Sequence, residues 1–266
     1  MANVLSRYGI KEVADVTFYT INETTGEPNE PVLYLDTLKV STIEQTSENS
    51  EARGGKGNAA LIAWDYGKEI TVTLEDALYS PKSLALIFGK TDTQGLPVFE
   101  TATSGFKIFK TFLPSQVSYT DSKYYAMYGG AKVELSEVKG WKISANNQGD
   151  MEQVTATGGG SILDVADVQY ITGKIAPGTP MVIDVSADGF PGTYYVTGDT
   201  YARRETDGVD EYFQFIIPKA KVLAESNTIT LEAEGDPTVF NMSLKVLRPK
   251  DGVMMKLVQY GVTVAS

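Results

Sequence analysis

The 266-residue chain contains no cysteine and no histidine. Without cysteine, disulfide bonds, thiolate nucleophiles and cysteine-bound zinc are excluded. Without histidine, the chain lacks the commonest general base and the commonest protein metal ligand, which excludes every catalytic scheme that depends on an imidazole. Chemistry by carboxylates alone stays open, but we expect no enzyme activity, no cofactor and no metal site.

Long hydrophobic runs are also missing. No stretch approaches the roughly 18 consecutive apolar residues of a membrane-spanning helix, so the sequence predicts no membrane span. The residues from Met1 to Gly9 do not combine a basic segment with an apolar run, and we therefore expect no signal peptide.

Positive charge is scarce. The chain has 23 Lys and Arg residues against 34 Asp and Glu residues, which gives a net charge of -11. Because an acidic protein repels nucleic acid and anionic lipid at neutral pH, sequence-specific DNA binding is not expected. The same sign of charge suits a wall that DNA slides past without sticking.

Apolar residues make up 42% of the chain, which is enough for a substantial core. They follow a period of two: Ile70, Val72 and Leu74, for example, alternate with Thr71 and Thr73. This pattern indicates strands with one buried and one solvated face. Further strands are expected at Val13–Ile21, Val32–Ile43, Val117–Tyr125, Ala131–Leu135, Trp141–Ala145, Met181–Val185, Thr193–Gly198, Phe213–Ile217, Ile229–Ala233, Phe240–Val246 and Val253–Val264. We predict a mainly β chain, folded as a β-sandwich or barrel.

One short helix is expected at about residues 80–88. Ser80 can cap its start, Pro81 suits the first helical position and Gly89 is placed to end it. Its apolar stripe consists of Leu84, Leu86 and Ile87. A weaker helical signal at Ser161–Tyr170 is also compatible with a strand.

Two glycine-bearing segments interrupt the strand pattern. Thr46–Asn58 is polar and longer than most connections in compact domains, so we expect a long assembly loop at about residues 46–63. Gly158-Gly159-Gly160 is typical of a hinge or linker. The chain is predicted to form a single domain over residues 1–266, in which an inserted β subdomain could occupy about residues 110–200.

Two motifs within or near this loop have more than one interpretation. Gly54-Gly55-Lys56-Gly57 lacks the Ser or Thr and the following helix of a phosphate-binding loop, so a flexible arm is favoured. Trp64-Asp65-Tyr66-Gly67 could stack on carbohydrate. We favour a hydrophobic anchor where a strand begins, with Asp65 bonded to backbone in a turn.

The densest acidic groups also have a simple interpretation. Asp207-Gly208-Val209-Asp210-Glu211 lies between two predicted strands and is favoured as a hairpin tip. A calcium site there is disfavoured because the calcium-loop spacing is absent. A glycosidase pair would need two carboxylates facing each other across a cleft, which the sequence does not reveal.

Three segments together resemble bacteriophage tail tube proteins of the major tail protein class: Gly54–Gly89, Gly192–Ala220 and Thr228–Leu247. The resemblance implies a β-sandwich or barrel that forms hexameric rings, stacked end to end around a channel through which DNA passes without specific binding. It also implies a structural protein of the virion tail that is made in the host cytoplasm and assembles with itself. Its further partners could be tape-measure, sheath, tail terminator and baseplate proteins.

Within this resemblance, the long loop corresponds to an arm that reaches the adjacent ring and becomes ordered on assembly. The candidate contacts between subunits are Glu51, Arg53, Gly54, Gly55, Lys56, Gly57, Asn58, Trp64 and Tyr66. Two alternatives stay open. One is a capsid, head-decoration or tail completion protein. The other is a carbohydrate-binding β-sandwich or carboxylate-based glycosidase that uses Trp64, Tyr66 or the Tyr194-Tyr195 pair as a stacking surface.

Overall fold

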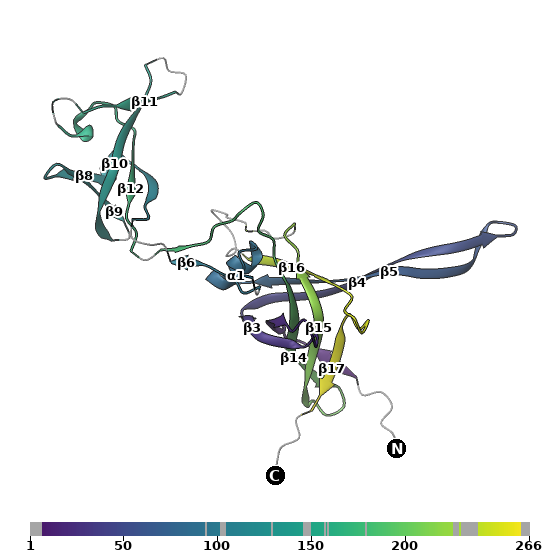
Figure 1. The fold of residues 1–266 in the computed structure, drawn as a ribbon. Coiled ribbons are helices and arrows are strands. Elements are labelled where there is room, and N and C mark those ends of the chain that lie inside the picture. The colour runs from purple at the N-terminus through teal and green to yellow at the C-terminus, as the bar shows by residue number, and fades with distance from the viewer. Residues whose placement is uncertain are drawn as a thin grey trace, which may run out of the picture. The chain divides into compact units, whose positions relative to one another are not determined.

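A computed structural model of the chain describes residues 7–261, apart from 94, 102–104, 129, 146–149, 157, 159, 179, 226–228 and 230–238. The structure is mainly antiparallel β, which confirms the predicted fold class. It divides into two compact units (Figure 1). Unit 1 comprises Met1–Phe99 and Ile183–Ser266, and unit 2 comprises Glu100–Val182.

Unit 1 contains a nine-stranded sheet built from β1 (Tyr8–Ile10), β2 (Asp15–Ile21), β3 (Pro28–Leu35), β4 (Leu38–Gly54), β5 (Ala59–Asp76), β14 (Thr193–Arg204), β15 (Asp210–Val222), β16 (Phe240–Val246) and β17 (Lys256–Tyr260). The strand order is β3-β2-β14-β15-β16-β5-β4. In addition, β1 pairs with β14 and β17 pairs with β15. The strands Thr193–Gly198 and Phe240–Val246 were therefore predicted in the right places, although β14 is longer than expected.

One face of this sheet is buried because apolar residues alternate along its strands. Ile70, Val72 and Leu74 of β5 are at most 3% exposed and join a core that also holds Phe18 and Tyr194. β3 and β4 end the path of paired strands, and no pairing joins them in the described part of the chain. The sheet is therefore open, and the barrel that was one predicted alternative does not close.

The predicted short helix is confirmed as α1 (Pro81–Ile87). The Oγ atom of Ser80 accepts the backbone N–H of Ser83 at 3.0 Å, and Ser83 Oγ accepts the N–H of Ser80 at 2.8 Å. This reciprocal capping box satisfies two N–H groups that a helix start leaves free. Gly89 follows the helix with φ +73°, and a Cβ there would lie 2.5 Å from the Phe190 backbone, so only glycine fits.

Unit 2 has its own sheet, built from β7 (Ile108–Phe112), β8 (Val117–Thr120), β9 (Lys123–Tyr128), β10 (Ala131–Ile143), β11 (Met151–Val154) and β12 (Tyr170–Ile175). The order is β7-β12-β10-β9-β8, and β11 pairs with β10. Two 3₁₀ turns, η1 (Pro114–Gln116) and η2 (Ile162–Asp164), complete it. Its separate apolar core consists of Phe112, Val117, Ala126, Leu135, Ile171 and Ile175.

The ends of unit 2 are tied together by two short strands. β6 (Glu100–Thr101) and β13 (Met181–Val182) form an antiparallel pair. The weaker helical signal at Ser161–Tyr170 corresponds to η2 and the first residue of β12. Gly140 allows η2 to pack closely, because a Cβ there would lie 2.2 Å from Ile162 Cγ2.

The prediction of a long loop at about residues 46–63 is wrong. These residues form the distal parts of β4 and β5, which continue as one antiparallel hairpin with a turn at residues 55–58. Polar residues can form such strands because the cross-strand hydrogen bonds satisfy the backbone on a ribbon that is solvated on both faces. The hydrophobic alternation that reveals buried strands is not required there.

Some predicted features lie largely outside the described residues. They are the strand at Ile229–Ala233, the part of the resembling segment from 228 to 238, and the central glycine of Gly158-Gly159-Gly160. Within the described part of the chain, no helix has the length and apolar character needed to cross a membrane.

Candidate assembly site

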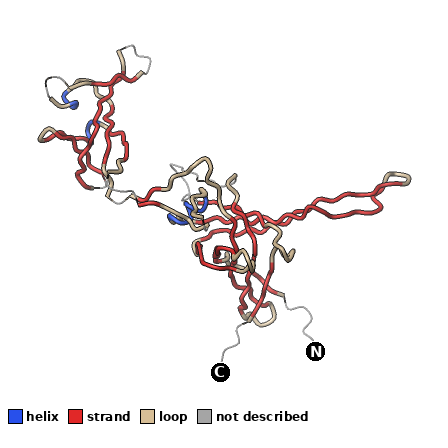
Figure 2. Tube along the Cα trace, in the orientation of Figure 1, coloured by secondary structure: helices blue, strands red, loops and turns tan. Residues whose placement is uncertain are grey.

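The hairpin of β4 and β5 extends beyond the core as an arm, defined here as residues 44–69 (Figure 2). Burial in β5 stops at Ile70, and residues 55–69 are all exposed. In β4 only Ala52 and Gly54 of the arm are half-buried. With a strand rise of about 3.3 Å per residue, eleven residues on each side give the arm a reach of roughly 35 Å.

A β-bulge at Gly67 determines which face of the arm the β5 residues from Ile62 to Tyr66 occupy, and a second register shift follows at Leu61. Thr46 pairs with Glu69 and Glu48 pairs with Tyr66, so β5 contains one residue more than β4 between these pairs. Gly67 has φ +62°, a left-handed conformation that suits the glycine of a G1 bulge. Side chains in β5 therefore change faces at this point, since strand side chains alternate with a period of two.

The bulge gives the arm one apolar face. Ile62, Trp64 and Tyr66 are 54%, 54% and 53% exposed. They lie opposite Ala52, Ser50 and Glu48 of β4, respectively, and paired residues share a face. Without the bulge, the three side chains would share the face of the buried Ile70, Val72 and Leu74.

The other face of the arm is polar. Its cross-strand pairs join Asn49 to Asp65 and Glu51 to Ala63. Arg53 donates from Nε to Glu51 Oε2 at 2.9 Å, and its Nη2 lies 2.5 Å from the same oxygen. The arm is therefore an amphipathic ribbon, although it buries neither face within the described part of the chain.

The glycines near Lys56 provide the tight turn at the tip of the arm. Gly55 and Gly57 have φ +78° and +88°, and Asn58 has φ +49°. The backbone N–H of Asn58 donates to the Gly55 carbonyl oxygen at 3.2 Å. The need for left-handed backbone explains why glycine and asparagine occur here, and no phosphate ligand is required to explain them. The element after the turn is a strand, whereas a phosphate-binding loop is followed by a helix.

All nine predicted contact residues belong to this arm. Leu61 and Ile62 were not among the predicted contacts, although they lie exposed on the same arm at 66% and 54%. The alternation of Ile62 with Trp64 and Tyr66 ahead of a glycine is a sequence signal for Ile62. The interpretation of Trp64 as a hydrophobic anchor where a strand begins, with Asp65 bonded to backbone in a turn, is wrong. Trp64 lies exposed within β5, and Asp65 pairs with Asn49 across the arm.

Tyr194 does not offer the stacking surface that one alternative required. Its ring is 1% exposed and makes an edge contact with Phe18 at a centroid distance of 6.1 Å. The hydroxyl donates to the Gly95 carbonyl oxygen at 2.8 Å, and burial raises the pKa of Tyr194 to about 12. The side chain is therefore part of the core.

The acidic segment at residues 207–211 belongs to a hairpin tip, as favoured. Asp207 accepts from Arg204 Nη1 at 2.7 Å, and Asp210 accepts from Arg203 Nε at 2.7 Å. The N–H of Val209 and then Arg204 lower the pKa of Asp207, whereas Arg203 lowers that of Asp210. These carboxylates stabilise the turn between β14 and β15.

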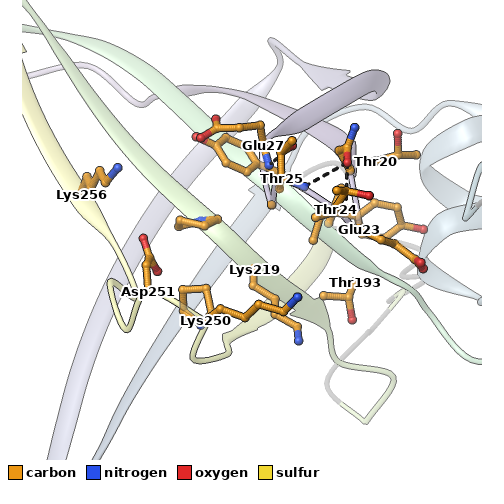
Figure 3. A pocket seen from close by; sticks show the side chains of 17 residues that line it. Thr20, Glu23, Thr24, Thr25, Glu27, Thr193, Lys219, Lys250, Asp251 and Lys256 are labelled. Carbon is orange, nitrogen blue, oxygen red and sulfur yellow. Dashed lines mark hydrogen bonds between the residues drawn. The ribbon is translucent and has the colours of Figure 1, made fainter.

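A pocket of about 530 Å³ lies at one end of the unit 1 sheet (Figure 3). We call it the turn pocket. Its walls come from the β2–β3 turn at residues 22–27, from β14 and β15, and from residues 249–251. The turn is fixed by Asn22, whose Oδ1 accepts the N–H groups of Thr24 and Thr25 at 3.0 and 3.1 Å. The charged lining residues are Glu23, Glu27, Lys219, Lys250, Asp251 and Lys256.

Most of the negative charge of the chain belongs to unit 1. Unit 2 contains 7 Lys and 8 Asp or Glu residues, so about -10 of the net -11 lies in unit 1. On the sheet face opposite the core, Asp15 of β2 pairs with Asp199 of β14. Slight burial and the charges of Asp15, Asp36 and Asp199 raise the pKa of Tyr34, whose hydroxyl donates to Asp15 Oδ2 at 3.2 Å. The part of this sheet face around Asp15 and Asp199 is therefore electronegative, whereas Lys221 and Lys245 pair farther along the same face.

A comparison with known protein families gives a match over nearly the whole chain. The model of the YomU/Tube protein family matches residues 8–259, from the first residue of β1 into β17. No curated protein matches the chain. The matched range contains both units and all predicted contact residues of the arm.

Proposed function

Because the chain belongs to the YomU/Tube protein family, we propose that it is the structural subunit of a phage tail tube. In this role it is a virion component that assembles with itself and has no catalytic activity. The finer proposal is that the subunits form hexameric rings, and that stacked rings enclose the channel for DNA. The sixfold symmetry follows from the resemblance of the sequence to tail tube proteins.

The observation that carries the proposal is the exposed amphipathic arm. A ribbon that places Ile62, Trp64 and Tyr66 in solvent gains nothing from them within the described part of its own subunit. Clustered exposed apolar side chains are typical of protein interfaces, and aromatic residues are enriched there. We propose that this row and the tip residues Glu51–Asn58 contact a neighbouring subunit.

The acidic part of the sheet face around Asp15 and Asp199 is the candidate channel wall. Asp15 and Asp199 lie on the face opposite the core, and an acidic wall would repel the phosphate backbone of DNA. DNA would then pass along the wall without specific binding. Unit 2, which carries little net charge, is proposed to be a subdomain inserted into the tube domain. The further partners are the tape-measure, sheath, terminator and baseplate proteins, and synthesis takes place in the host cytoplasm.

Negative-stain electron microscopy of the concentrated protein tests this proposal. We expect rings or tubes for the wild type and single subunits for a Trp64→Asp/Tyr66→Asp variant, because buried carboxylates would oppose the arm contact. A Phe109→Asp variant is the matched control, since Phe109 is a similarly exposed aromatic residue in unit 2 (60% exposed). A wild-type protein that stays monomeric at every concentration and salt would refute the proposal, and closed shells would indicate a head protein instead.

A further inference from the structure

We infer that the tip of the arm inserts into the turn pocket of a second copy of this chain. The inference rests on the proposed function and goes beyond it, because it names the surface that receives the arm. It follows from the shapes and the charges of the two surfaces.

The tip is slender and carries one free cation. Gly54, Gly55 and Gly57 have no side chains, so the turn presents mainly backbone and the Lys56 side chain. Arg53, the other nearby cation, is bound to Glu51 of its own strand. Lys56 is exposed and makes no ion pair within the described residues.

The turn pocket offers a preformed acidic wall that matches this cation. Glu23 and Glu27 project from the β2–β3 turn, and neither carboxylate forms an ion pair within the described part of the chain. The turn is held by the two N–H bonds to Asn22 Oδ1 and by a backbone bond from Gly26 N–H to the Asn22 oxygen at 2.7 Å. A rigid receptor loses little entropy on binding, which favours docking.

The opposite wall of the pocket is mainly basic. Lys219, Lys250 and Lys256 line it across from the Glu27 turn, together with Asp251, and none of the three lysines forms an ion pair in the described residues (Figure 3). Behind the tip, the arm carries Glu51, whose charge Arg53 already neutralises. The charge match between the two surfaces is therefore that of Lys56 with Glu23 and Glu27, and opposite charges of this kind give interfaces their register.

The occupant of the pocket must come from another copy. The strands β4 and β5 stay paired with each other from Leu38 to Gly54, and the arm that they form projects away from the rest of unit 1 (Figure 1). A reach of roughly 35 Å is suited to bridging two subunits. A pocket of about 530 Å³ can hold a turn of four small and polar residues.

Charge reversal tests the inference. Lys56→Glu alone and Glu23→Lys/Glu27→Lys alone are each expected to raise the critical concentration for tube formation at least tenfold at low salt, because like charges then face each other. The chain that carries all three substitutions restores opposite charges and is expected to assemble within about threefold of wild type. The matched controls are Lys68→Glu on the arm shaft and Glu30→Lys on β3 outside the pocket, which should assemble like wild type.

The outcomes separate this inference from the proposed function. Wild-type tubes together with unimpaired reversal variants overturn the docking of the tip in this pocket and leave the tube function intact. Impaired single reversals that the combination does not rescue also overturn it. If the wild type forms no tubes, both ideas fail. Circular dichroism and thermal unfolding of each variant confirm that the exposed substitutions leave the subunit folded.

Discussion

Replacing Gly67 by valine should disable the arm while leaving the subunit folded. Gly67 occupies the left-handed region at φ +62°, where an L-residue costs about 1–2 kcal/mol. A Cβ at this position would meet nothing closer than Glu48 Cδ and Cγ at 3.8 Å, so the expected cost is conformational strain and not a collision. Valine, which is β-branched, strongly prefers the extended backbone of a regular strand.

The strain favours a hairpin register without the bulge. Starting from the Thr46–Glu69 pair, a regular ladder would place Tyr66 opposite Asn49 and Trp64 opposite Glu51, which transfers the apolar row to the polar face. Since 1.4 kcal/mol is tenfold in an equilibrium, the bulged register loses roughly 5- to 30-fold in relative population. The critical concentration for tube formation should rise by a similar factor, because only the arm in the bulged register presents its apolar row to the neighbouring subunit.

The assay is sedimentation of tubes over a concentration series, with thermal unfolding of the free subunit as the second measurement. The unfolding midpoint should stay at the wild-type value, since the arm contributes nothing to the buried core. Deletion of Gly67 is the matched control: it removes the extra residue, keeps Tyr66 opposite Glu48 and should preserve assembly. Wild-type assembly by Gly67→Val, or equal failure of the deletion, would refute the role of the bulge.

Three further predictions concern the two units. Gly198→Ala should lower the free energy of unfolding by about 1–3 kcal/mol in denaturant titration, because its Cβ would lie 2.1 Å from the buried Phe215 ring. Replacement of residues 102–180 by Asn-Gly should leave unit 1 with a cooperative thermal transition, because Thr101 and Met181 are already paired as in a hairpin; loss of that transition would contradict the separate cores. The stability that Tyr194 contributes is present below pH 10 and should fall as the pH rises toward 12, because its pKa is raised in the folded state. Tyr194→Phe should remove this part of the pH dependence and cost about 1 kcal/mol at pH 8 through loss of the bond to Gly95.

The buried part of the fold could be predicted from the sequence because burial leaves a pattern. The alternation at Ile70–Leu74 reports one buried face, and Ser80, Pro81 and Gly89 report the helix ends through specific backbone bonds. The arm leaves no such pattern in β4, where both faces are solvated and polar residues satisfy the strand equally well. The long polar segment of the arm was therefore interpreted as a loop.

Neither the bulge nor the turn pocket could be predicted from the sequence, and the reasons differ. An isolated glycine such as Gly67 within a strand pattern does suggest a bulge, but the tight turn predicted around Asp65 competed with that interpretation. The pocket brings together the turn at residues 22–27, Lys219 and Lys250, which are far apart in the sequence. Only the strand order places them together, and no local pattern encodes that order.

The free edge of β4 has a consequence for the subunit before assembly. β4 pairs only with β5 among the described strands, so its other side presents unpaired backbone groups over a long ribbon. Such an edge can recruit further strands at random, and acidic side chains along it discourage this. Glu44, Glu48 and Glu51 lie along β4 and supply that repulsion. If the subunits form a tube as proposed, we expect these carboxylates to slow the first contacts between newly made subunits, and added salt to weaken this effect by screening.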